Sequence, residues 1–126
     1  MSDIRNVIPL EQCGIGDVEV VGGKNASLGE MIQNLDSLGV RVPGGFATTA
    51  HAYRSFLAHD GLADKINAML ASLDVDNIQD LQNCGGEIRR LIMELPFPAD
   101  LEKDIEQSFS ALEKEYGKEV SWAVRS

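Results

Sequence analysis

The sequence contains little histidine or cysteine, the side chains that most often bind transition metals. Two residues of each type occur among 126. Cys13 and Cys84 lie far apart and match no metal-binding spacing, so we expect two buried or half-buried thiols. His51 and His59 supply too few ligands for a zinc site. We therefore predict no metal-binding residue here, and the sequence assigns no function to these four side chains.

Basic residues and long apolar runs are also scarce. Eleven Lys and Arg residues against twenty Asp and Glu residues give a net charge of −9, which argues against general binding to nucleic acid or to an anionic membrane. No apolar run is long enough to span a bilayer, and the first residues lack the apolar core of a signal peptide. We therefore expect a cytoplasmic protein, and its 44% apolar content suffices for one domain with a core.

The most informative stretch is Val21–Met31, in which two glycines precede a lysine and an apolar-periodic run. Gly22 and Gly23 lack a Cβ, so the backbone can turn tightly and approach a ligand. A lysine at position 24, beside the N–H groups of a helix start, suits phosphate. The spacing differs from that of a P-loop, which requires Ser or Thr where Asn25 stands. On spacing alone, a phosphate site and a Gly-Gly turn with a solvated lysine are equally supported.

Hydrophobic periodicity predicts a helix-rich chain with a few short strands. We expect helices at residues 25–38, 50–59, 62–73, 78–94 and 99–116. Extended segments are expected at residues 7–10, 40–43, 46–48 and 120–126, and residues 18–21 are expected to be a strand or a loop. Asn25 or Ser27 is predicted to cap the first helix and Thr48 or Thr49 the second, with Gly39 just past the first. The pair Gly85-Gly86 inside the fourth helix predicts close helix packing or a kink.

Three blocks, Val21–Met31, Val42–Thr49 and Ala123–Ser126, resemble in order and interval the start of the phosphoenolpyruvate synthase family. Pyruvate phosphate dikinase and related phosphotransferases share a looser version. The resemblance implies an α+β, helix-rich fold, namely the incomplete N-terminal subdomain of an ATP-grasp-like nucleotide-binding domain. Residues 1–126 are then expected to be the N-terminal part of that ATP-binding domain, with the chain stopping inside it.

The resemblance also implies an activity for the full-length protein. That family is a group of transferases of gluconeogenesis, which convert pyruvate, ATP and water to phosphoenolpyruvate, AMP and phosphate through a phosphohistidine on another domain. The fragment alone is expected to be inactive and to hold no catalytic residue. Two alternatives stay open: a fragment of a dikinase or antibiotic phosphotransferase, and a non-catalytic helical interaction domain. The sequence leaves open whether the full-length protein is a homo-oligomer.

The resemblance assigns four residues to ATP phosphates. Lys24 and Arg125 match the family's phosphate-contacting lysine and arginine, and Gly22 and Gly23 let main-chain N–H groups approach the ligand. The family's Mg²⁺ ligands lie later in its sequence, so none is assigned here, and pyruvate would bind to other domains. The structural alternative for Arg125 is a strand-end residue paired with one of the many carboxylates.

Overall fold

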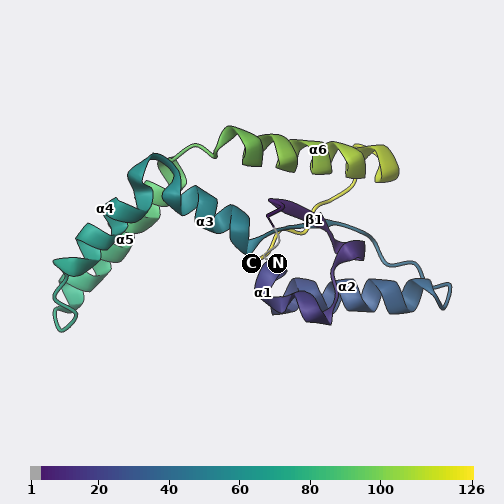
Figure 1. Ribbon diagram of the computed structural model, residues 1–126, viewed down its shortest axis with the longest axis horizontal. Coiled ribbons are helices and arrows are strands. Elements are labelled where there is room, and N and C mark those ends of the chain that lie inside the picture. Colours follow the sequence, from purple (N-terminus) through teal and green to yellow (C-terminus); the bar gives the residue numbers. More distant parts are fainter. Residues whose placement is uncertain (1–3) are drawn as a thin grey trace. The chain divides into compact units, whose positions relative to one another are not determined.

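The computed structural model describes residues 4–126, which are mostly helical and contain a two-stranded antiparallel sheet (Figure 1). The elements in chain order are β1 (Val7–Pro9), η1 (Leu10–Gln12), η2 (Ile15–Asp17), α1 (Val18–Val21), α2 (Gly23–Asp36), β2 (Phe46–Thr48), α3 (Ala50–Ala58), η3 (His59–Gly61), α4 (Leu62–Ala71), α5 (Ile78–Glu94) and α6 (Ala99–Tyr116). The chain divides into two compact units. The first contains residues up to Ala52 together with Ala99–Ser126, and the second contains Tyr53–Pro98.

The sheet of the first unit joins the start of the chain to the segment that follows α2. Val7 pairs with Thr48 and Pro9 pairs with Phe46. Pro9 has no N–H to donate, which suits it to the end of a short strand. Buried apolar residues beneath the sheet form the core together with α1 and α2: Ile8, Leu10, Cys13, Val21, Ala26, Ile32 and Ala47.

Helix α2 is clamped along its middle by the turns that follow β1. A Cβ added to Gly29 would lie 2.4 Å from the carbonyl oxygen of Cys13 and 2.6 Å from that of Leu10. The amide Nε2 of Gln33 donates to the carbonyl oxygens of Cys13 and Glu11, at 2.7 and 3.0 Å. The backbone of these turns therefore touches the helix directly, which fixes α2 in the first unit.

Several predicted helix boundaries are confirmed by their caps. Gly39 has a φ of 78° and donates to the carbonyl of Asp36 at 3.0 Å, while Val40 donates to Leu35 at 2.9 Å. These two bonds form the Schellman motif that suits glycine at this position. Thr49 caps α3 by accepting from the N–H of Ala52 at 3.1 Å. The helices expected at 78–94 and 99–116 have those bounds.

Two other predictions at the start of α2 are wrong. Residues 18–21 form the helix α1, because four residues turn once and close with the N–H of Gly22 on the carbonyl of Val18, at 2.8 Å. Neither Asn25 nor Ser27 caps α2. Gly22 is the N-cap, and α2 begins two residues earlier than expected.

The strand expected at residues 120–126 is also absent, since this described segment has no regular secondary structure. A strand needs a neighbouring strand to receive its main-chain hydrogen bonds, and β1 and β2 pair only with each other among residues 4–126. The aromatic residue of the segment packs on a helix instead. The ring of Trp122 stacks on Phe109 of α6, with 4.6 Å between the ring centroids.

The second unit is a helical hairpin in which α4 packs against α5. Asn77 caps α5 by accepting from the N–H of Asp80 at 3.2 Å, and the rings of Phe56 and Phe97 meet edge to face at 5.8 Å. A Cβ added to Gly86 would meet only the side chain of Arg89 within 4 Å. The close helix packing predicted at Gly85-Gly86 is therefore not found.

Candidate functional site

The glycines predicted to contact a ligand lie at the junction between α1 and α2. Gly22 has φ 85° and ψ 161°, a conformation that a side chain would strain. Gly23 is the first residue of α2. Both are exposed, and a Cβ added to either would meet no atom within 4 Å. The backbone at this corner is therefore open to a ligand.

The main-chain donors at the corner are unused. The N–H of Ala26 donates to the carbonyl of Gly22 at 3.0 Å, which starts the ladder of α2. The preceding N–H groups, of Gly23, Lys24 and Asn25, find no acceptor among residues 4–126, and no side chain caps them. Unpaired N–H groups at a helix start carry partial positive charge and favour an anion.

Lys24, at the start of α2, contacts the segment that follows α6 and contains Arg125. Lys24 Nζ donates to the main-chain oxygen of Ser126, the residue after Arg125, at 3.2 Å. Figure 1 shows the C-terminal end of the chain returning to the start of α2. Both cationic side chains are exposed, and Arg125 pairs with no carboxylate among residues 4–126. The carboxylate-paired strand end considered for Arg125 is thus not observed.

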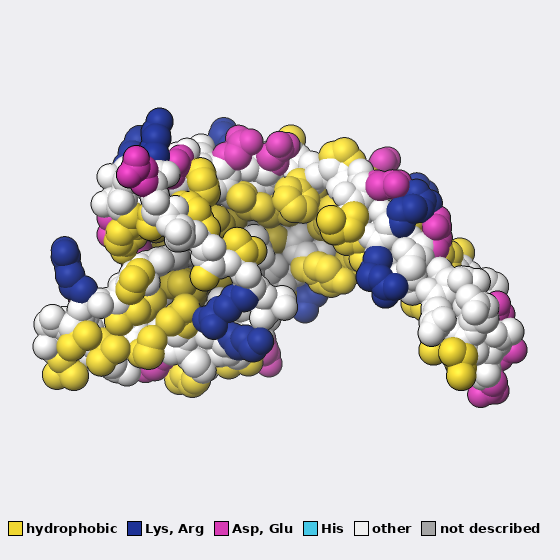
Figure 2. Space-filling view, turned by 180° about the vertical axis from the view of Figure 1, so that it is seen from behind, with side chains coloured by type: hydrophobic (Ala, Val, Ile, Leu, Met, Phe, Trp, Pro, Cys, Tyr) yellow, Lys and Arg dark blue, Asp and Glu magenta, His cyan; other side chains and the backbone are white. Residues whose placement is uncertain are grey.

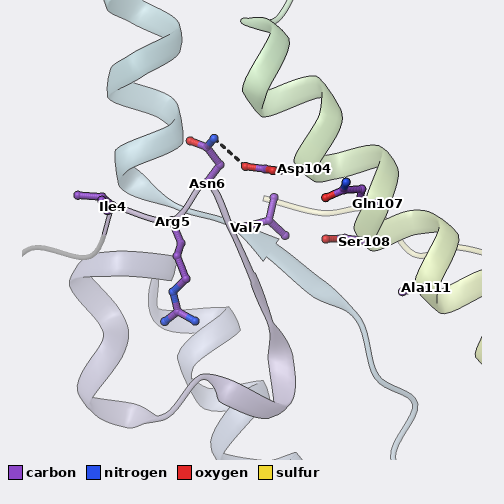
Figure 3. A pocket seen from close by; sticks show the side chains of 8 residues that line it. All are labelled: Ile4, Arg5, Asn6, Val7, Asp104, Gln107, Ser108 and Ala111. Carbon is purple, nitrogen blue, oxygen red and sulfur yellow. Dashed lines mark hydrogen bonds between the residues drawn. The ribbon is translucent and has the colours of Figure 1, made fainter.

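A second hollow lies in the first unit, between β1 and α6, and has the opposite character. Its lining includes Asn6, Asp104, Gln107 and Ser108 (Figure 3). Asn6 is buried, and its Nδ2 donates to Asp104 Oδ2 at 2.9 Å and to Asp100 Oδ2 at 3.2 Å. These carboxylates would repel phosphate. The hollow therefore marks a hydrogen-bonded joint between α6 and β1, and it does not extend the cationic corner.

The described residues contain neither a cluster of metal-ligating side chains nor a helix that could span a membrane. Within residues 4–126, no group of three or more His, Cys, Asp or Glu side chains is arranged to hold a metal ion. None of the helices in that range combines the length and hydrophobicity needed to cross a membrane. Figure 2 shows hydrophobic side chains exposed on the first unit, where Met31 is 44% and Phe109 39% accessible.

The sequence did not reveal how the corner is held. Asn25 Nδ2 donates to the carbonyl of Val21 at 2.9 Å, across the turn made by Gly22. Asn25 was expected to act as a cap, which is an acceptor role, whereas the structure gives it a donor role. An asparagine four residues after the end of one helix and three after a glycine was the available signal, because that distance matches one helical turn.

Comparison with known proteins gives the chain a family context. A family model described as "Pyruvate phosphate dikinase, AMP/ATP-binding domain" matches residues 18–126. The phosphoenolpyruvate synthase of Neisseria meningitidis serogroup B is 54% identical over 121 residues, which cover 95% of this chain and 15% of the relative. The phosphoenolpyruvate synthase of Pseudomonas aeruginosa is 56% identical over 109 residues, which cover 86% of this chain and 14% of the relative. That of Escherichia coli is 44% identical over 120 residues, covering 95% and 15%. The chain thus spans about 15% of the length of these relatives.

Proposed function

The chain belongs to the pyruvate phosphate dikinase AMP/ATP-binding domain family, and from this premise we propose that residues 1–126 are the N-terminal part of the ATP-binding domain of a phosphoenolpyruvate synthase. Relatives of that name at 44–56% identity over most of the chain support the proposal. The complete protein would convert pyruvate, ATP and water to phosphoenolpyruvate, AMP and phosphate. A phosphohistidine and the pyruvate site would lie outside this chain, so residues 1–126 alone would not catalyse the reaction.

The observation that carries the proposal is the contact between Lys24 and the segment that holds Arg125. Phosphoryl transfer depends mainly on positioning and on neutralising the charge of non-bridging oxygens. Lys24 would supply a compact point charge, and Arg125 would clamp two oxygens at once. Gly22 and Gly23 would admit the phosphates to the unused N–H groups of α2. These groups bind and orient ATP, and none of them takes part in proton transfer.

Magnesium and the remainder of the ATP-grasp-like fold belong to the same proposal. Mg²⁺ accompanies ATP in phosphoryl transfer and neutralises charge on the phosphate oxygens. Its carboxylate ligands would lie outside this chain, as the family resemblance implies. We further propose a cytoplasmic enzyme of gluconeogenesis, whose oligomeric state stays open.

The test uses the complete gene product. It is incubated with ATP and Mg²⁺, with and without pyruvate and with and without inorganic phosphate, and the products are identified by phosphorus NMR. Pyruvate-dependent formation of phosphoenolpyruvate, AMP and phosphate is expected. Formation of pyrophosphate with consumption of added phosphate would indicate a dikinase, the alternative that the family description favours. Absence of any pyruvate dependence would contradict both.

Lys24→Ala in the complete enzyme tests the proposed role of the corner. We expect turnover to fall by roughly 100- to 1000-fold, the effect of removing one preorganised donor at a reacting oxygen. Thermal stability should hardly change, because the side chain is exposed. Lys65→Ala, which removes an exposed lysine from α4 in the second unit, is the matched control. Wild-type turnover in Lys24→Ala would remove this residue from the site.

A further inference from the structure

We infer that Asn25 is a positioning residue for phosphate: its side-chain amide binds the carbonyl of Val21 and thereby keeps the main-chain N–H groups of residues 23–25 free for the ligand. The inference rests on the proposed ATP site. It concerns a residue that contacts no ligand itself and acts through the backbone of the glycine turn.

In an uninterrupted α-helix each N–H donates to the carbonyl four residues earlier, so the N–H of Asn25 would donate to Val21. The left-handed φ of 85° at Gly22 interrupts this ladder. The Val21 carbonyl instead accepts from Asn25 Nδ2 at 2.9 Å. The side chain of Asn25 thus takes the place of its own main-chain donor.

Removing that side chain would change the balance at the junction. Val21 is buried, and a buried carbonyl without a hydrogen bond is costly. The junction can recover the bond if Gly22 rotates into the helical region, which lets the N–H of Asn25 reach Val21. This rearrangement would merge α1 with α2 and consume a donor that the phosphate needs. Asn25 therefore favours the interrupted junction over the continuous helix.

The neighbouring bonds confine the interruption to three main-chain donors. The N–H of Gly22 closes α1 on Val18, and the N–H of Ala26 opens α2 on Gly22, so both helices are complete on either side. Only the three donors between them are unused, and they lie at the end of α2 that carries Lys24. The ligand class that fits adjacent N–H donors beside a cation is a phosphate ester, here the polyphosphate of ATP.

The test compares Asn25→Ala with Asn25→Gln in the complete protein. A glutamine keeps a side-chain amide donor on an arm that is one methylene longer and flexible, so it can still reach the Val21 carbonyl across the interrupted junction. Dissociation constants for ATP and for adenosine are measured by calorimetry. We expect Asn25→Ala to weaken ATP binding about tenfold and adenosine binding less than about twofold, with Asn25→Gln closer to the wild type than Asn25→Ala. Ser27→Ala, on the same turn and exposed, is the control.

Amide hydrogen exchange without ligand gives an independent measure. The Asn25 N–H should exchange rapidly in the wild type and more slowly in Asn25→Ala, because it then pairs with Val21. Equal weakening of ATP and adenosine binding, an Asn25→Gln variant that binds ATP as weakly as Asn25→Ala, or unchanged exchange in Asn25→Ala would each overturn the role of Asn25. A wild-type protein that binds ATP no better than adenosine would overturn the phosphate site itself, and the inference with it.

Discussion

The two halves of α2 use the same residue type for opposite purposes. At its start, Gly22 and Gly23 have no atom within 4 Å of an added Cβ, and the nearby N–H groups are unused. In its middle, an added Cβ at Gly29 would lie 2.4 Å from a carbonyl oxygen, and the amide of Gln33 donates to two carbonyls. Groups that already make contacts and hydrogen bonds mark the part of the helix that stabilises the fold. Groups without such partners mark the part that is available to a ligand.

The same distinction separates the cationic corner from the hollow beside β1. The hollow is lined by Arg5 as well as Asn6, but Arg5 Nη1 donates to Gln12 Oε1 at 3.0 Å and the Nδ2 of Asn6 is shared between Asp100 and Asp104, so both side chains already have acceptors. At the corner, the N–H groups of Gly23, Lys24 and Asn25 have no acceptor within residues 4–126, and no ion pair of Lys24 or Arg125 with a carboxylate is found in that range. For an anion, the supply of unused donors is therefore a better guide to the site than the depth of a pocket.

The largest effect is expected from Gly29→Ala, which attacks the clamped half. A methyl group cannot fit between α2 and the carbonyls of Leu10 and Cys13, so backbone must shift. Overpacking of this kind should lower the free energy of unfolding by about 3 kcal/mol. It is measured by urea unfolding of the complete protein, with hydrogen exchange of α2 to locate the change.

Gly23→Ala is the matched control in the open half. Its new Cβ meets no atom within 4 Å, so the free energy of unfolding should stay the same or rise slightly. Equal losses of stability in Gly29→Ala and Gly23→Ala would abolish the distinction between the two halves of the helix.

Gln33→Ala should have a smaller effect on stability. It leaves the carbonyls of Glu11 and Cys13 without their side-chain donor, which costs about 1–2 kcal/mol. Nucleotide affinity should be retained, because the start of α2 is untouched. Asn34→Ala removes an exposed neighbouring amide and is the control. Loss of ATP affinity in Gln33→Ala without loss of stability would show that the two halves are coupled.

Much of this arrangement follows from local sequence signals. The helices at 78–94 and 99–116 have strong apolar periodicity, and Gly39, Thr49 and Asn77 have the chemistry of the caps they form. The contact between Lys24 and Ser126, next to Arg125, has no such local signal, and the assignment of Lys24 and Arg125 to one phosphate site stays a prediction from the family resemblance. No local pattern links residues so far apart in the sequence.

The errors come from partners that a sequence does not specify. Val18–Val21 is rich in β-branched residues and reads as extended, yet packing against α2 makes it helical. Residues 120–126 have strand character but find no strand to pair with. Close packing was expected at Gly85-Gly86, whereas the glycine that touches another backbone is Gly29. Gly29 lies three residues after Ala26 and three before Ile32, on the buried face of α2, and this helical spacing was the available signal.

The smallest effect is expected on α5, where charged groups meet in solvent. Arg90 donates to Glu87 and, at 2.6 Å, to Glu94. The hydrogen bond from Arg90, supported by its charge, lowers the pKa of Glu87 below its usual 4.5. A carboxyl group whose pKa is lower in the folded than in the unfolded state stabilises the fold when the pH is above its unfolded-state pKa. This contribution disappears as the pH falls through the folded-state pKa. Glu87→Gln should therefore lower Tm slightly at pH 7, less than Gln33→Ala, and not at all in strong acid or high salt. A Tm difference that persists in acid would mean that Glu87 stabilises α5 through packing. An exposed side chain such as Glu87 would then stabilise the fold through its contacts, as Gly29 and Gln33 do in the middle of α2.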